Sequence, residues 1–221
     1  MTLFRNILRA SLVAPLALAI AACGTDAETD GALEGDPIAP IAAPEGTSWI
    51  DTVSVTEADG YVVGNPDAPL KLIKYGSLTC NACAMFAEDS SGSLKEDYVA
   101  SGVVSFELRN QVHNGVDLAL ARLVRCSAPG SYQPLSDQVW KNLQTLLANA
   151  DQETVANALT QAPEERYVIL AQNLGFFEFF AARGVSVDQA VSCLSDAASL
   201  EAIAERSDQQ SQELGVTSTP T

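Results

Sequence analysis

The pattern of hydrophobic and polar positions divides the chain into a part with short strands and a longer helical part. An apolar run over residues 70–75 predicts a buried strand, and alternation over residues 103–108 predicts a second one. Between them, the segment from Cys80 to Val99 lacks proline and internal β-branched residues and predicts a helix, which Gly92 breaks or kinks. Together they form a β-α-β unit, whose strands normally pair in parallel.

Helical periodicity dominates residues 115–214. Two sets of apolar residues each share one helical face: Val116, Leu120, Leu123 and Val124, and Val139, Leu143, Leu146 and Leu147. Further helices are predicted near residues 152–161, 164–182, 187–194 and 197–213, with Gly184 and Gly215 at two of the helix ends. The pattern therefore predicts a large helical insertion after the β-α-β unit.

The N-terminal residues 1–22 have the pattern of an export signal. Arginines precede an apolar run over residues 11–22, which is too short to span a bilayer as a helix. The small residues just before Cys23 resemble the lipobox of bacterial lipoproteins, so we expect lipidation of Cys23 and a position on the periplasmic side of a bacterial membrane. The alternative is ordinary cleavage at residues 19–21, which leaves Cys23 as a free thiol.

Residues 23–48 have the composition of a tether. They are rich in Ala, Gly, Pro, Asp and Glu and contain almost no large apolar side chain, so they cannot bury enough surface to fold. Globular character begins at Trp49, with a weak strand pattern around Val53 and Val55. The sequence therefore predicts one folded domain over residues 49–221.

The charge of the chain limits its partners. Asp and Glu number 28 against 12 Lys and Arg, which gives a formal charge of −16. The chain therefore lacks the positive field that attracts nucleic acid or anionic lipid headgroups, and nucleic-acid binding is not expected. The acidity is also explained by solubility alone.

The cysteines carry the candidate chemistry. With Cys23 assigned to the lipid, an even set of four remains in a compartment that permits disulfides. Cys80-Asn81-Ala82-Cys83 directly follows a predicted strand and opens a predicted helix. Because the unpaired N–H groups of a helix N-terminus stabilise a thiolate, we expect Cys80 to be the nucleophile and Cys83 the resolving thiol.

Zinc binding is the main alternative for this motif, since a C-x-x-C pair is also half of a four-ligand site. The other half is missing: Cys126 and Cys193 lie far apart in the sequence without neighbouring ligands, and His113 is the single histidine. We therefore expect no metal and no cofactor, and we expect His113 to be a solvated loop residue rather than a base.

The chain resembles the DsbA-like thioredoxin-fold proteins, in particular the bacterial group with a helical insertion. The resemblance covers about residues 50–221 and runs through residues 64–69, Tyr75, the motif Cys80 to Cys83, Phe86 and residues 215–221. It implies an α/β thioredoxin-like fold with an all-helical insertion at about 115–214. It also implies a disulfide oxidase that acts on reduced or unfolded exported proteins and is served by a membrane redox partner.

The resemblance assigns roles to four further residues. In that family a Thr-Pro dipeptide forms a cis peptide beside the active cysteines and presents backbone groups to the substrate, which here points to Thr219 and Pro220. Cys126 and Cys193 are predicted to form a structural disulfide, as a second pair does in some relatives. Such a bridge stabilises by about 4 kcal/mol in the chain-entropy argument. The alternative is two buried free thiols.

Two departures from the family bear on mechanism. Asn81-Ala82 stand where such oxidases usually have Pro-His, so we expect a weaker oxidant, and isomerase or reductase activity stays open. Lys74 stands where the family commonly has a buried glutamate that relays protons. Lys74 either lowers a thiol pKa as a nearby cation or snorkels to solvent, and we favour snorkelling. A non-catalytic, metal-binding or structural lipoprotein is the remaining alternative.

Two features fall outside this chemistry. The aromatic run over residues 176–180 could line a substrate groove, but core packing is the favoured interpretation because aromatic side chains on helices mostly serve burial. The chain also stops one residue after Pro220, where the family continues with a β-hairpin and a helix. We therefore expect a truncated sequence that leaves an open apolar sheet edge.

Overall fold

The computed structural model describes residues 36–221, so the predicted signal, Cys23 and the first part of the tether lie outside the described residues. One compact unit spans Ile38–Thr221 and therefore begins before Trp49. The backbone N–H of Ile41 donates to the carbonyl of Ser101 at 2.8 Å, and the carbonyl of Ile41 accepts from the buried indole of Trp49 at 2.7 Å. A buried indole N–H needs such an acceptor, which explains why the last part of the predicted tether lies on the domain.

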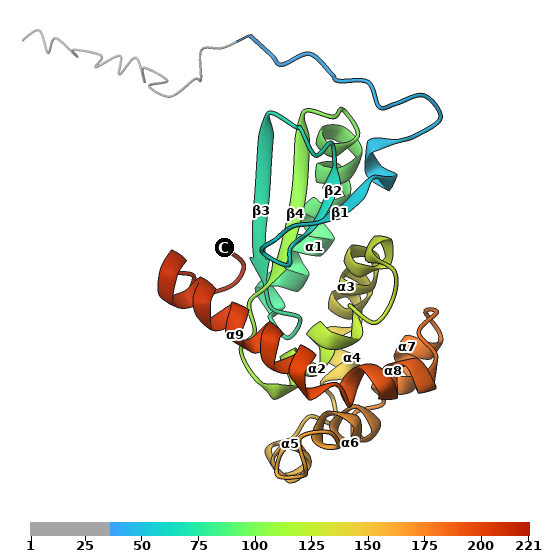
Figure 1. Cartoon of the computed structure of the whole chain (residues 1–221), viewed down its shortest axis with the longest axis vertical. Coiled ribbons are helices and arrows are strands. Elements are labelled where there is room, and N and C mark those ends of the chain that lie inside the picture. The colour runs from blue at the N-terminus through green and yellow to red at the C-terminus, as the bar shows by residue number, and fades with distance from the viewer. Residues whose placement is uncertain (1–35) are drawn as a thin grey trace, which may run out of the picture. The chain divides into compact units, whose positions relative to one another are not determined.

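A four-stranded sheet forms the first half of the domain (Figure 1). Its strands are β1 (Val53–Val55), β2 (Tyr61–Gly64), β3 (Leu70–Gly76) and β4 (Val104–Asn110), in the order β1-β2-β4-β3. β3 and β4 correspond to the two predicted strands and pair in parallel, as the β-α-β pattern requires, whereas the other two pairs are antiparallel. β2 is a strand that the sequence pattern did not predict, because it is only four residues long and runs directly into turn residues.

The helix that connects β3 to β4 begins directly after Cys80. α1 spans Asn81–Ser93 and continues without interruption into a π-helical segment, η2, over Leu94–Val99. Of the predicted break or kink at Gly92, the break is wrong, because Gly92 lies inside α1. A glycine within a helix costs about 1 kcal/mol relative to alanine, which weakens the helix without ending it.

The predicted insertion between β4 and the C-terminal segment is entirely helical. It contains α2 (Gly115–Leu123), η3 (Pro129–Ser131), α3 (Tyr132–Lys141), α4 (Leu143–Leu146), α5 (Gln152–Leu159), α6 (Arg166–Asn173), α7 (Phe176–Ala181), α8 (Val187–Leu194) and α9 (Ala197–Leu214); a short η1 (Trp49–Asp51) precedes β1. Across residues 36–221, no helix has the length and apolar character needed to cross a membrane.

Two predicted helices are each divided in the structure. The helix expected at 164–182 is split into α6 and α7 at Gly175, which has φ of 73° and so adopts the left-handed conformation that commonly ends a helix. The face that joins Val139 to Leu147 is likewise divided between α3 and α4 at Asn142. By contrast, Gly215, with φ of 67°, ends α9 as predicted.

α2 lies at the centre of the core. Its residues Leu120 and Leu123, together with Val124 just beyond its end, are fully buried, and the helix contacts α5, α6, α8 and α9. Each such side chain contributes about 1.5–3 kcal/mol by leaving water. Three of the four phenylalanines of residues 176–180 are also buried in this core, which confirms the core-packing interpretation of the aromatic run.

Candidate active site

Cys80 lies at the point where the polypeptide passes from β3 into α1. It is the N-cap residue of α1, and its sulfur accepts a hydrogen bond from the backbone N–H of Cys83 at 3.4 Å. Cys80 is partly exposed, whereas Cys83, one helical turn further, is completely buried. Both are free thiols here, so the structure shows the dithiol form. Only one of the two sulfurs is therefore accessible to a protein substrate.

The two thiols differ in acidity. Burial alone raises the pKa of Cys80, but interactions with Thr219 and with the backbone N–H groups of Cys83 and Ala82 outweigh it, and the pKa lies below its ordinary value. Burial raises the pKa of Cys83 to about 11, with a further contribution from the neighbouring Cys80. Cys80 is thus the thiol that ionises first, as a nucleophile must.

The C-terminal segment, residues 215–221, also contacts Cys80. The Thr219-Pro220 peptide bond is cis, and the carbonyl of Thr219 accepts a hydrogen bond from the Cys80 thiol at 3.3 Å. Thr221 then exchanges two backbone hydrogen bonds with Tyr75 of β3, at 2.8 and 3.2 Å. Residues that are far apart in sequence therefore meet at one sulfur.

The loop before Cys80 is held in place by the helical insertion. The carboxylate of Asp117 in α2 accepts from the backbone N–H of Leu78 at 2.8 Å and from that of His113 at 2.9 Å. The indole of Trp140 in α3 donates to the carbonyl of Ser77 at 2.9 Å. The sequence analysis did not single out Asp117 or Trp140. The signal in the sequence that could have identified Asp117 is a single acidic residue among the apolar positions of α2.

Replacing Asp117 by alanine is expected to destabilise the domain. Asp117 is fully buried, so its loss leaves two backbone N–H groups without an acceptor, at a cost of about 3 kcal/mol. Urea unfolding measures the effect, with Asp208→Ala as the control, because Asp208 is exposed on α9. An Asp117→Ala variant as stable as the control would contradict this role of Asp117.

Lys74 does not reach solvent, so the favoured prediction that it snorkels is wrong. Only 4% of the residue is exposed. Its amine lies 4.3 Å from the ring centre of Phe86 and 4.1 Å from that of Trp140, and it donates to the carbonyl of Cys83 at 3.4 Å. Two aromatic rings close the path to water, which a sequence pattern on an edge strand does not reveal.

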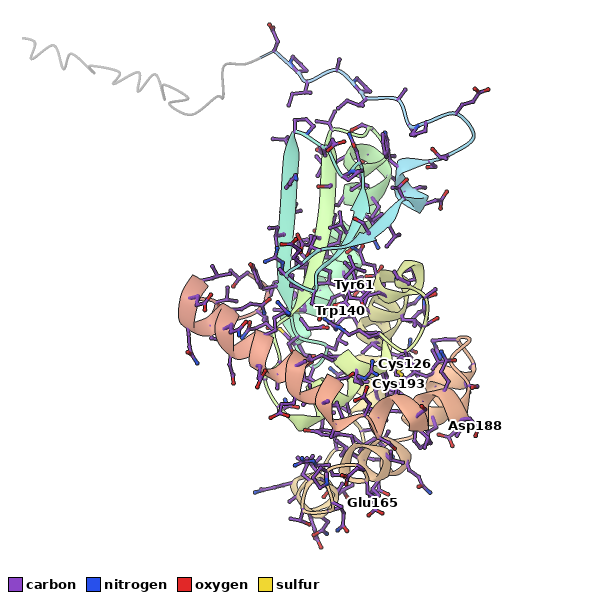
Figure 2. The ribbon with its side chains drawn as sticks, viewed as in Figure 1. Tyr61, Cys126, Trp140, Glu165, Asp188 and Cys193 are labelled. Atoms are coloured by element: carbon purple, nitrogen blue, oxygen red, sulfur yellow. A yellow bond between two sulfur atoms is a disulfide. The ribbon has the colours of Figure 1, made fainter. Side chains whose placement is uncertain are left out.

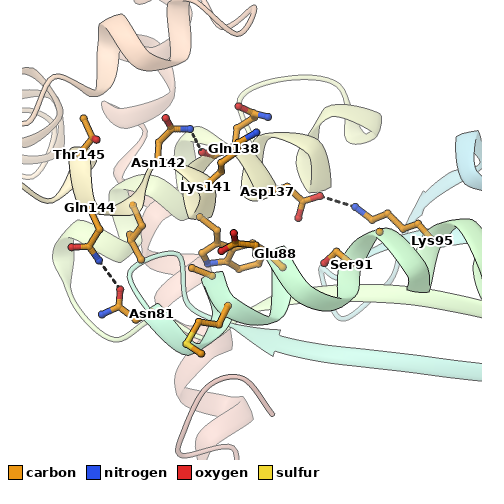
Figure 3. A pocket seen from close by; sticks show the side chains of 16 residues that line it. Asn81, Glu88, Ser91, Lys95, Asp137, Gln138, Lys141, Asn142, Gln144 and Thr145 are labelled. Atoms are coloured by element: carbon orange, nitrogen blue, oxygen red, sulfur yellow. Dashed lines mark hydrogen bonds and ion pairs between the residues drawn. The ribbon is translucent and has the colours of Figure 1, made fainter.

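A groove of about 950 Å³ runs beside the site between α1 and the α3–α4 segment (Figure 3). One end of the groove lies at Asn81, inside the cysteine motif. The side-chain oxygen of Asn81 accepts a hydrogen bond from the side-chain amide of Gln144 in α4 at 2.9 Å. Lys95 and Asp137 form an ion pair at 2.7 Å across the other part of the groove. The insertion therefore forms one wall next to the cysteine motif.

Cys126 and Cys193 are joined by a disulfide, with their Cα atoms 6.0 Å apart (Figure 2). Cys126 lies just beyond α2 and Cys193 lies in α8, so the bridge ties two helices of the insertion. The guanidinium of Arg122 also donates to the carbonyl of Cys193 at 3.1 Å. This pair lies apart from Cys80 and Cys83 and makes no part of the reactive site.

The single histidine lies near the site but outside its hydrogen-bonded centre. His113 is exposed, and its Nε2 lies 3.5 Å from the hydroxyl of Thr219. Within residues 36–221, no group of three or more His, Cys, Asp or Glu side chains is arranged to hold a metal ion.

Comparison with known proteins agrees with this arrangement. The thioredoxin family matches residues 56–221, which is three quarters of the chain and includes the cysteine motif and the cis peptide. The chain belongs to the thioredoxin family. The predicted thioredoxin-like fold with a helical insertion is thereby confirmed.

Two solved structures share the fold over most of the domain. A protein-disulfide isomerase of Novosphingobium aromaticivorans is 28% identical with a TM-score of 0.68, and the match covers 72% of this chain and 83% of that one. The α-DsbA1 of Wolbachia pipientis is 21% identical with a TM-score of 0.60, covering 75% and 74%.

One curated relative matches over a shorter stretch. The disulfide bond formation protein D of Bacillus subtilis (strain 168) is 29% identical over 80 residues, 36% of this chain. The match spans 31% of that protein's length.

Proposed function

We propose that the protein is a thiol–disulfide oxidoreductase that exchanges disulfides with exported proteins. The observation that carries the proposal is the position of Cys80, which is partly exposed at the N-terminus of α1 beside the carbonyl of Thr219, with a lowered pKa. An ionised Cys80 attacks a substrate disulfide, forms a mixed disulfide with one of its sulfurs and releases the other as a thiolate; Cys83 then attacks the mixed disulfide, releases the second substrate thiolate and closes the Cys80–Cys83 bond. In the oxidising direction the same steps run in reverse.

Thr219 and Pro220 form the proposed substrate-binding edge. The Thr219 carbonyl lies within hydrogen-bond distance of the Cys80 sulfur, so a substrate chain that pairs with the backbone here places its own sulfur at Cys80. Backbone pairing reads no particular side chain. This supports a broad range of reduced or unfolded exported proteins as substrates.

The proposed location is the periplasmic side of a bacterial membrane. The proposal rests on the signal pattern of residues 1–22, the lipobox-like residues before Cys23 and the tether that follows. A lipid on Cys23 supplies the membrane contact, and a membrane redox partner then resets the Cys80–Cys83 pair. The formal charge of −16 argues against nucleic acid as a partner.

Net oxidation of substrates is the proposed direction, and isomerisation or reduction is the second candidate. The second candidate is favoured by the name of the 28% identical Novosphingobium structure, a protein-disulfide isomerase, and by the absence of a histidine between the cysteines. Equilibration with glutathione buffers measures the reduction potential of the Cys80–Cys83 pair: about −120 mV indicates a strong oxidant and about −270 mV a reductant. We expect a reduction potential between these two values. We also expect reduced ribonuclease to refold faster with the protein than without it.

The same preparation tests the non-catalytic alternative. Thiolate absorbance titrated against pH is expected to show Cys80 ionising below its ordinary pKa. Ionisation near about 8.5 together with stoichiometric zinc would instead indicate a metal-binding or structural C-x-x-C.

A further inference from the structure

Lys74 is a buried amine that the proposed exchange reaction does not yet use. It lies on β3, and the residues that the structure describes provide no carboxylate in ion-pair contact with it. Its polar contact is the carbonyl of Cys83, at 3.4 Å. Because a buried ammonium without a counter-ion is costly, the neutral amine becomes accessible near neutral pH.

The groups around Lys74 shift the pKa of its amine in opposite directions. Burial lowers the pKa of Lys74 to about 8. Charges on Cys83 of α1, on its N-cap residue Cys80 and on Asp137 of α3 raise the pKa of Lys74, whereas Lys95 of η2 lowers it. The amine can therefore both accept and release a proton in the range in which an exported protein works.

Cys83 needs such a proton acceptor. Its thiol is completely buried and its pKa lies at about 11, so almost none is ionised at neutral pH. Only the thiolate attacks a disulfide, and bulk water does not reach a sulfur with no exposed surface. The proton of Cys83 must therefore leave to a group inside the protein, directly or through one water.

We propose that the amine of Lys74 takes the proton of the Cys83 thiol when Cys83 attacks the mixed disulfide at Cys80. This inference rests on the proposed function. The neutral amine becomes an ammonium and the thiol becomes a thiolate. That thiolate forms the Cys80–Cys83 bond as the bond between Cys80 and the substrate breaks, and the substrate leaves as a thiolate. In the oxidising direction the substrate thiolate attacks Cys80, Cys83 leaves as a thiolate, and Lys74 returns the proton.

An amine has a specific advantage for this step. Proton transfer from a thiol to an amine creates two opposite charges that attract each other in a poorly hydrated site. The ammonium that forms lies against the faces of Phe86 and Trp140, which stabilise a cation. Lys74 thereby stabilises the Cys83 thiolate at the moment it attacks or leaves.

An aromatic disulfide that releases a coloured thiolate separates the two steps in one experiment. Attack by Cys80 releases the first coloured thiolate, and attack by Cys83 on the mixed disulfide releases the second. For Lys74→Met we expect an unchanged first phase and a second phase about 100-fold slower, the usual effect of losing a general base. Lys71→Met is the matched control, because Lys71 is an exposed lysine of the same strand.

Lys74→Arg distinguishes a proton acceptor from a fixed charge. Arginine keeps the positive charge but does not give up its proton, so the second phase is expected to be slow, as in Lys74→Met. A second phase of wild-type speed in Lys74→Arg would overturn the proposal and leave an electrostatic role. A second phase of wild-type speed in Lys74→Met would exclude both roles.

The pH profile gives a readout that loss of packing does not produce. In the wild-type protein the second phase is expected to accelerate with pH and to level off at or below about 8, because the mixed disulfide lacks the Cys80 thiolate that raises the pKa of Lys74. Acceleration that continues toward about 11, the pKa of Cys83, would overturn the proposal even if the variants do not fold. A first phase no faster than that of a free thiol would instead count against the proposed function.

Discussion

Replacing Cys80 by serine is expected to abolish disulfide exchange and return insulin reduction and ribonuclease refolding to their uncatalysed rates. A serine hydroxyl does not ionise at neutral pH and forms no disulfide, so neither the nucleophile nor the mixed disulfide exists in the variant. The helix N-terminus and the Thr219 carbonyl stay in place, which makes the change a test of the sulfur alone. Equal activity in the wild-type and variant proteins would remove Cys80 from the mechanism.

Cys83→Ser is the matched control for Cys80→Ser. It removes a thiol from the same motif but leaves the accessible nucleophile, so the variant should accumulate a mixed disulfide with the substrate instead of losing reactivity.

Alkylation of the wild-type protein at neutral pH, followed by mass spectrometry, checks which of the two thiols is more acidic. Because the pKa of Cys80 is lowered and that of Cys83 is raised to about 11, we expect label on Cys80 only. Equal labelling of both thiols would contradict the assigned roles.

Removing the Cys126–Cys193 disulfide is expected to have the largest effect on the free energy of unfolding. The bridge closes a loop over a sequence separation of 67 residues. Restriction of the unfolded chain by a loop of this size is worth about 4 kcal/mol. A Cys126→Ala/Cys193→Ala double variant should therefore lose about this much free energy of unfolding, measured by urea denaturation.

Reduction of the wild-type protein provides the control for that experiment. Under a reductant strong enough to open the Cys126–Cys193 bridge, the stabilities of the wild-type protein and the double variant should converge. Because the bridge lies between α2 and α8, away from Cys80, the reactive thiol should keep its alkylation rate in the double variant. Equal unfolding midpoints without reductant would show that the bridge contributes no net stability.

The helical insertion connects the core to the reactive loop. Asp117 of α2 holds the backbone of Leu78, and Trp140 of α3 holds that of Ser77 while its ring covers Lys74. The same helices therefore bury the core, fix the loop before Cys80 and exclude water from the amine. Altered packing in α2 or α3 is therefore expected to change the reactivity of Cys80 and Cys83 through these contacts.

Local sequence patterns were sufficient for the β-α-β unit, the cysteine motif at the start of α1 and the buried helical faces of α2. They failed at two glycines and at the start of the domain. Gly92 did not end α1, because one glycine in an exposed helix position costs only about 1 kcal/mol relative to alanine. Gly175 did divide one predicted helix, because the chain turns there with a positive φ. Ile41 belongs to the domain because a buried indole needs its carbonyl.

The sequence by itself determined the β-α-β unit, the helical insertion and the reactive pair, since these follow from short-range periodicity and from two cysteines one helical turn apart, and its resemblance to a known family implied the thioredoxin-like fold. Only the tertiary structure decided how acidic each thiol is and what surrounds Lys74. Those properties depend on burial and on contacts with Thr219 and Trp140, which come from distant parts of the chain. Solvent exclusion is a property of packed neighbours, and a linear pattern does not contain it.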